Sequence, residues 1–96
     1  MSESRRDPPV ARTRVTVVNA RGLHARAAAR FARLAEGFAA EVTVSRDDLA
    51  VPATSILGLM MLAAAPGTEL ELEARGADAE AAVAALADLV RRGFDE

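Results

Sequence analysis

The stretch TELELEA, residues 68–74, decides the fold class of this 96-residue chain. Its residues alternate strictly, with Leu70 and Leu72 on one side and glutamates on the other. Alternation of apolar and polar residues is typical of a β-strand with one buried and one solvated face. Antiparallel sheets are built from such strands and need helices on their apolar face only. The stretch therefore predicts an α+β protein with an open-faced sheet.

The same alternation recurs in two other parts of the chain. TRVTVV, residues 13–18, predicts a half-buried strand, and EVTVS, residues 41–45, predicts another. After an RDD turn, LAV at 49–51 begins a short return strand, so 41–51 is expected to be a hairpin that Pro52 ends. The residues expected to face the core from these strands are Val15, Val17, Val42 and Val44.

Three stretches have helical spacing instead. Over residues 25–36, apolar side chains recur every three or four positions, opposite a stripe of arginines. ILGLMML, residues 56–62, predicts a short helix that Thr54 or Ser55 caps, and Asp78 is expected to cap the last helix. The resulting order, β-α-β-β-α-β-α, predicts an open-faced β-sandwich, in which three helices cover one face of a four-stranded antiparallel sheet.

Length and composition limit the class of protein. About half of the residues are apolar (51%), which suits one compact domain, placed at 12–96 after a flexible N-terminal arm, 1–11. The absence of cysteine excludes disulfides and thiolate chemistry. No apolar run approaches the roughly 20 residues that span a bilayer, and the N-terminus lacks the apolar core of a secretory signal. We therefore expect a cytoplasmic monomer without membrane insertion.

Charge is distributed unevenly along the chain. The formal net charge is −2 (12 − 14), and all twelve basic residues are arginine. Residues 1–33 hold eight arginines against two acids, which gives +6, whereas residues 34–96 hold four against twelve, which gives −8. The acidic balance disfavours a nucleic-acid partner. The arginines instead cluster around His24, the only histidine.

His24 stands where a loop becomes a helix. Free backbone N–H groups and the positive dipole end favour an anion at such a place, and Gly22 allows the loop to bend into it. Arg26 can direct a forked donor at phosphate oxygens. These residues suit an imidazole that takes and gives a phosphoryl group, since neither a general base nor a carboxylate pair for hydrolysis stands nearby. We expect no cofactor and no metal, because no second His or Cys exists.

The 54–62 segment is apolar nearly all round. A short helix on one side of a small sheet cannot bury every face, so its surplus predicts an exposed docking patch in which methionine adapts to several partners. For Ser55, the residues alone favour a plain N-cap, although a hydroxyl at that place can also accept a phosphate.

Two motifs at a fixed spacing resemble a known family. GLHAR followed by a helix, with SILGLMML thirty-one residues later (55 − 24), resembles HPr, the histidine phosphocarrier of the bacterial phosphotransferase system, over residues 13–94. The resemblance implies that enzyme I, charged by phosphoenolpyruvate, phosphorylates Nδ1 of His24, and that Arg26 contacts the phosphoryl group. An enzyme IIA would then accept it, so the protein would carry a transient phosphohistidine rather than turn over substrate by itself. Ser55 matches the serine that HPr kinase/phosphorylase modifies in many bacteria. The resemblance also implies a partner-docking surface, which is expected to include Ala25, Ile56, Leu57, Met60 and Met61.

One residue departs from the family pattern, and two segments point to a branch of the family. Ala27 stands where proline usually follows the arginine, and alanine is compatible with a helix, so the change concerns the rigidity of the loop rather than the chemistry. RRGFDE and GLMMLAA resemble the nitrogen-type branch, NPr, which serves a regulatory enzyme IIA. The alternatives are a sugar-transport HPr and a regulatory module that docks through the 54–62 helix without phosphoryl transfer. A ferredoxin-like structural domain would leave the His24 site unexplained.

Overall fold

The computed structural model describes residues 8–96 and has the predicted order of elements, followed by a short 3-10 turn, Gly93–Asp95. The strands are β1 (Val10–Thr16), β2 (Glu41–Arg46), β3 (Leu49–Pro52) and β4 (Glu69–Arg75). The helices are α1 (Ala25–Glu36), α2 (Ile56–Met61) and α3 (Ala79–Arg91). The predicted α+β open-faced sandwich is confirmed. No helix in this part of the chain is long and apolar enough to cross a membrane.

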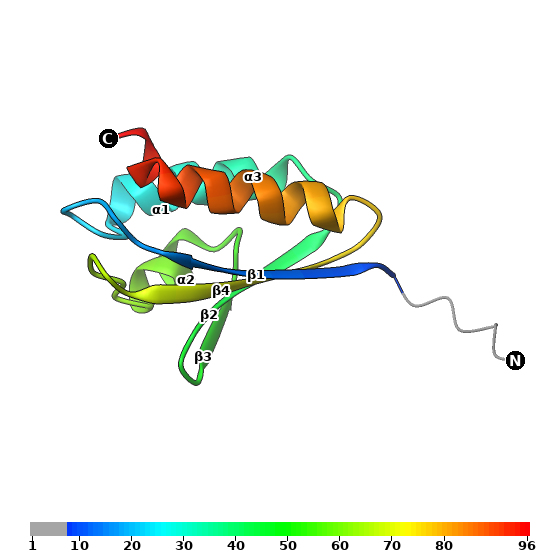
Figure 1. The fold of residues 1–96 in the computed structure, drawn as a ribbon, viewed down its shortest axis with the longest axis horizontal. Coiled ribbons are helices and arrows are strands. Elements are labelled where there is room, and N and C mark those ends of the chain that lie inside the picture. The colour runs from blue at the N-terminus through cyan, green and yellow to red at the C-terminus, as the bar shows by residue number, and fades with distance from the viewer. Residues whose placement is uncertain (1–7) are drawn as a thin grey trace, which may run out of the picture.

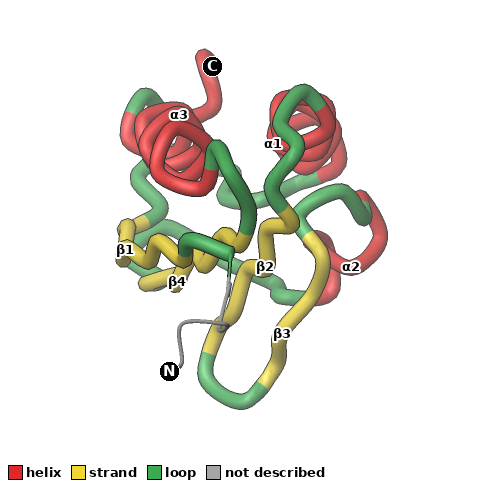
Figure 2. Tube along the Cα trace, turned by 90° about the vertical axis from the view of Figure 1, so that its right-hand side faces the viewer, coloured by secondary structure: helices red, strands yellow, loops and turns green. Residues whose placement is uncertain are grey.

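The four strands form one antiparallel sheet in the order β1-β4-β2-β3. β4, the strand of alternating leucine and glutamate, is central and pairs with both β1 and β2. Figure 2 shows α1 and α3 side by side over one face of the sheet, with α2 beside the β3 edge. The opposite face carries the glutamates of β4 and is open to solvent.

The core lies between the sheet and these helices. The strand residues expected to face it, Val15, Val17, Val42, Val44, Leu70 and Leu72, are all buried. Phe31 of α1 and Phe94 of the 3-10 turn are 1% and 0% exposed and are the largest buried side chains. Because most other helix residues facing the sheet are small, the helix backbones can approach the strands closely.

Two expectations about this fold need correction. β1 begins at Val10, so Val10 and Ala11 pair with β4 and belong to the sheet rather than to the arm expected at 1–11. Hydrophobic alternation could not show this, because Val10 is apolar on the solvated face and Thr13 is polar on the inward face. The first seven residues of the expected arm lie outside the described residues.

Asp78 precedes α3, but its side chain does not cap that helix. Its carboxylate instead accepts hydrogen bonds from the backbone N–H groups of Ala39 and Ala40, at 2.9 and 2.7 Å. These bonds join the α1–β2 connection to the start of α3, and they hold the pKa of Asp78 below its usual value. The predicted cap is therefore wrong, because a more distant segment supplies better-placed donors.

Candidate functional site

Gly22 shapes the loop that leads into α1. Its φ is +65°, a conformation that glycine adopts easily, and its N–H donates to the carbonyl of Asn19 at 3.1 Å. A Cβ at this position would lie 2.2 Å from the carbonyl oxygen of Ala64. Next in the chain, the N–H of Leu23 donates to that same oxygen at 2.9 Å. The loop before His24 is therefore fastened to the loop after α2, and only glycine fits the contact.

His24 is the N-cap of α1. Its backbone is extended, and its Nδ1 accepts a hydrogen bond from the backbone N–H of Arg26 at 3.3 Å. The other ring nitrogen, Nε2, contacts the carboxylate of Glu96. Because Nδ1 accepts a hydrogen, the proton of a neutral ring belongs on Nε2, which donates it to Glu96. The two contacts together assign the unprotonated nitrogen of the ring to Nδ1, at the start of the helix.

The C-terminal residues hold this arrangement from the far end of the chain. The side-chain amide of Asn19 donates to Glu96 at 2.9 Å and to the carbonyl of Gly22 at 2.8 Å. Arg30 donates from Nη1 to the carbonyls of Phe94 and Asp95, at 2.6 and 3.2 Å. These hydrogen bonds keep the last turn beside the loop that carries the histidine.

Glu96 is an ionised carboxylate at neutral pH. The hydrogen bonds from Asn19 and then from His24 lower its pKa below the usual value, against a smaller opposing effect of burial. Sequence patterns did not identify Glu96, Asn19 or Arg30 as site residues. Glu96 is 72 positions from His24 along the chain, so no local spacing reports the contact. The one available signal was an asparagine soon after a strand, which commonly makes side-chain bonds to a turn.

Arg26 and Ala25 lie in the first turn of α1 and are both exposed. The first turn of α1 contains no acidic residue, so the positive end of the helix dipole is not neutralised from within the helix. Arg26 forms no ion pair with any residue in the range 8–96. The structure thus brings an exposed cation and the Nδ1 of His24 to the same helix start.

The apolar side chains of the 54–62 segment lie partly in the core and partly at the surface. Leu59 and Leu62 are buried, at 0% and 2% exposure. The predicted docking residues of α2 remain at the surface: Ile56 44%, Leu57 72%, Met60 40% and Met61 63% exposed. Together with Ala25 they make up what we call the docking patch. α2 packs against α1, so the patch belongs to the same side of the molecule as the His24 helix (Figure 2).

Ser55 is the N-cap of α2, as its sequence position predicted. Its Oγ accepts a hydrogen bond from the backbone N–H of Gly58 at 2.9 Å, and its side chain is half-buried. Its place beside Ile56 and Leu57 puts the hydroxyl at the border of the docking patch.

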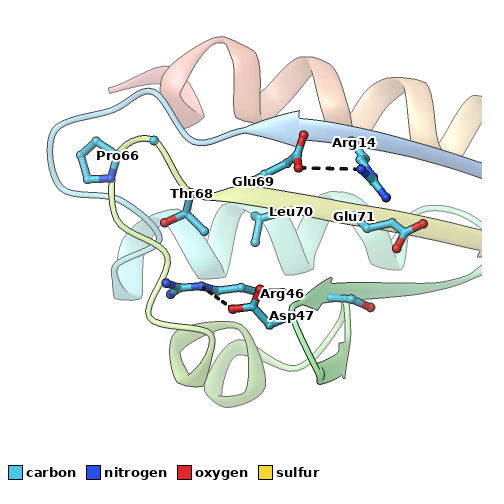
Figure 3. A pocket seen from close by; sticks show the side chains of 10 residues that line it. Arg14, Arg46, Asp47, Pro66, Thr68, Glu69, Leu70 and Glu71 are labelled. Carbon is cyan, nitrogen blue, oxygen red and sulfur yellow. Dashed lines mark ion pairs between the residues drawn. The ribbon is translucent and has the colours of Figure 1, made fainter.

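A polar hollow of about 670 Å³ lies elsewhere, on the open face of the sheet. Figure 3 shows Arg14, Arg46 and Glu69 around it, and His24 is not among its lining residues. Within residues 8–96, no three His, Asp or Glu side chains gather as a metal site. The candidate site is therefore the open helix start at His24 rather than an enclosed pocket.

Comparisons with known proteins find similarity over most of the chain. A family model described as "PTS HPr component phosphorylation site" matches residues 11–92. Phosphocarrier protein HPr of Neisseria meningitidis serogroup A is 49% identical over 82 residues, which cover 85% of this chain and 92% of that protein. Phosphocarrier protein NPr of Shewanella violacea is 45% identical over 82 residues, covering 85% and 90%.

Solved structures show the same similarity in three dimensions. The crystal structure of HPr-C-His from Thermoanaerobacter tengcongensis superposes with a TM-score of 0.85 at 38% identity, over 90% of this chain and 97% of that one.

Proposed function

Since the chain belongs to the HPr family of phosphocarriers, we propose that His24 accepts a phosphoryl group on Nδ1 from enzyme I and passes it to an enzyme IIA in the cytoplasm. The observation that carries this proposal is the pair of contacts on the imidazole. Glu96 binds Nε2 and the N–H of Arg26 binds Nδ1, so the nucleophilic lone pair lies where a helix start can receive an anion.

In the proposed step, the Nδ1 lone pair of His24 forms a bond to phosphorus while the bond from phosphorus to the donor breaks. The proton on Nε2 stays in place and its hydrogen bond to Glu96 strengthens as the ring gains positive charge. The N–H of Arg26 turns from the ring nitrogen to a phosphoryl oxygen, and the Arg26 guanidinium offers further donors. Transfer to the acceptor is the reverse of this step on a second partner, and no proton needs to be removed by a general base.

The docking patch is proposed to hold both partners in turn. Exposed apolar side chains next to the site give enzyme I and enzyme IIA a shared surface, and Met60 and Met61 can repack against different partners. Met60→Glu places a charge in the middle of this patch, so we expect weaker binding to both partners. The alternative is a regulatory module that binds partners without phosphoryl transfer. It predicts that His24→Ala leaves the affinity for those partners unchanged, whereas Met60→Glu abolishes it.

The direct test is incubation with enzyme I and phosphoenolpyruvate. We expect an acid-labile, base-stable phosphate on His24, and its loss in His24→Asn. Asparagine is the sharper replacement because it can still cap α1 while lacking a nucleophilic nitrogen. If His24→Asn still acquires the label, the assignment of the acceptor is wrong.

Ser55 is proposed as a regulatory phosphorylation site for HPr kinase/phosphorylase. A phosphate adds about −1.5 to −2 charges at the border of an apolar surface, so it is expected to weaken docking of enzyme I. Ser55→Asp should slow phosphorylation of His24, whereas Ser55→Asn, which keeps a capping side chain without charge, should not. Equal transfer rates in the wild type and Ser55→Asp count against this role.

We further propose that the protein serves the nitrogen-type branch. The support is the resemblance of RRGFDE and GLMMLAA to NPr, while relatives named NPr and HPr have comparable identities. Transfer rates from phosphorylated protein to a regulatory enzyme IIA and to a sugar-permease enzyme IIA separate the two branches. Faster transfer to the sugar-permease domain favours the sugar-transport alternative.

A further inference from the structure

The outer edge of β1 presents main-chain groups to solvent in a regular pattern. The N–H of Val17 donates to Thr68 at 2.9 Å, and the carbonyl of Pro9 accepts from Gly76 at 2.9 Å, so odd-numbered residues of this segment bond toward β4. Successive residues of a strand direct their main-chain groups to opposite sides. The outward N–H and C=O groups therefore belong to Val10, Arg12, Arg14 and Thr16. No other strand among residues 8–96 pairs with this edge.

A shallow groove of about 500 Å³ runs beside that edge, between β1 and α3. Small or β-branched side chains form much of its wall: Ala11, Thr13, Val83, Ala84 and Ala87. Val83 and Ala87 are already buried, at 6% and 2% exposure, and make a packed base. An added strand would find its donors and acceptors on β1, and its inward side chains would enter this groove.

The arginines on the open face determine which side chains an added strand should have. Arg12 and Arg14 lie on this face, beside the glutamates of β4. Arg12 binds Glu73 at 2.8 Å through Nη2 and at 3.0 Å through Nε. Arg14 reaches only to 4.0 Å from Glu69, and its side chain is 69% exposed (Figure 3). Carboxylates of an added strand, on the other side of these arginines, would accept their remaining N–H hydrogen bonds.

A second copy of the chain does not fit this edge. Two copies related by a two-fold axis pair antiparallel, with outward residues facing outward residues. The registers that overlap most of β1 then place Arg12 opposite Arg12, Arg12 opposite Arg14, or Arg14 opposite Arg14. Like charges directly opposite each other destabilise a strand pair. The edge thus disfavours self-association while remaining open to an acidic strand.

We propose that the outer edge of β1 binds an extended acidic segment of another protein as a fifth strand. Acidic residues of the segment face Arg12 and Arg14, and small or β-branched apolar residues between them enter the groove under α3. This is strand addition, in which main-chain hydrogen bonds hold the segment and alternate side chains select it. β1 and β3 are opposite edges of the sheet and α2 lies beside β3, so the segment binds without covering the docking patch.

The test is an amide NMR titration of the full chain with a peptide of alternating glutamate and valine, as long as β1. We expect shifts and slowed hydrogen exchange at Arg12, Arg14 and Thr16, and no change at β3. A peptide of alternating lysine and valine should not bind. Replacing both arginines by glutamine should weaken the glutamate peptide by about fivefold or more.

A second variant separates strand addition from attraction between charges. Thr16→Pro removes one outward N–H and keeps both arginines, and proline is tolerated at the outer edge of a strand. We expect about fivefold weaker peptide binding, the loss of one hydrogen bond. Thermal melting checks that each variant folds. Unchanged affinity in Thr16→Pro, equal binding of the lysine peptide, or dimerisation of the chain through β1 each overturns the proposal.

Discussion

α1 and α2 both begin with a side-chain N-cap, and the comparison shows how the proposed phosphoryl acceptor differs from a serine cap. In each, an extended N-cap residue accepts a hydrogen bond from the first turn. The serine cap of α2 is the closer, 2.9 Å from Ser55 Oγ to the N–H of Gly58, against 3.3 Å from His24 Nδ1 to the N–H of Arg26. Ser55 is thus the better cap, whereas in His24 the capping atom Nδ1 is also the proposed nucleophile.

The two helix starts differ most in their distant contacts. His24 is held on its second nitrogen by Glu96, and Gly22 fixes its loop against Ala64. The hydrogen bonds of Ser55 are all local: its Oγ accepts from Gly58, its N–H donates to Pro52, and its carbonyl accepts from Leu59. A side chain at a helix start becomes a site when residues from elsewhere in the fold fix its orientation.

The largest expected effect comes from the contact under the His24 loop. Gly22→Ala combines a positive φ with a 2.2 Å clash against a backbone oxygen, so we expect a loss of more than about 2 kcal/mol in urea unfolding. Gly67→Ala is the matched control, because Gly67 has φ +90° but nothing within 4 Å of its added Cβ. An equal loss in the two variants contradicts the role given to the Ala64 contact.

These two regions were also unequally predictable from the sequence. The bounds of α1, the Ser55 cap and the buried faces of the strands follow from local periodicity and capping, which short stretches fully encode. The site also depends on Glu96, Asn19 and Arg30. Their contacts join segments that are far apart in the sequence, so no local pattern predicts them. Asp78 shows that a distant contact can also make a local prediction wrong. The capping rule assigned its carboxylate to α3, but the carboxylate accepts hydrogen bonds from the amides of Ala39 and Ala40 instead.

The next effect distinguishes the two caps directly. Ser55→Ala removes the closer cap and is expected to cost about 1 kcal/mol while leaving phosphorylation of His24 intact. His24→Ala is expected to cost less stability and to abolish the label. Thr54→Ala, which alters the neighbouring exposed residue, serves as the control in the same unfolding experiment. If His24→Ala costs more stability than Ser55→Ala, the comparison of the two caps fails.

A smaller effect is expected from pH, and of the two helix starts only that of α1 is involved. The pKa of Glu96 is lowered in the folded protein, so its contribution to stability is present above the unfolded value of about 4.5 and is lost as the pH falls through the folded value. Glu96→Gln should therefore flatten the acid limb of a stability–pH curve and slow phosphorylation of His24.

Asp78→Asn provides the control for this pH dependence. The pKa of Asp78 is also lowered, from 3.8, so its replacement should flatten the acid limb as well. Asp78 contacts Ala39 and Ala40 and not the histidine loop, so phosphorylation should proceed at the wild-type rate. Slower phosphorylation in both variants would mean that the effect of Glu96 is general rather than local.

The smallest effect is expected from Ala27→Pro, which restores the residue usual in the family. Proline in the first turn removes only an N–H without an intrahelical acceptor and reduces the entropy of the unfolded chain, so a gain below about 1 kcal/mol is expected. Ala29→Pro, two residues further into α1, should instead cost about 3 kcal/mol. A loss of stability in Ala27→Pro, measured in urea, would show that the buried Ala27 site has no room for the ring.

The contact between Glu96 and His24 has a practical consequence for handling the protein. Arg30 holds the last turn in place, so a fusion partner or affinity tag joined after Glu96 would lie next to the imidazole proposed as the phosphoryl acceptor. β1 begins at the other end of the sheet from the His24 loop (Figure 1). Material for kinetic work is therefore best tagged at the N-terminus, because β1 starts far from the His24 imidazole.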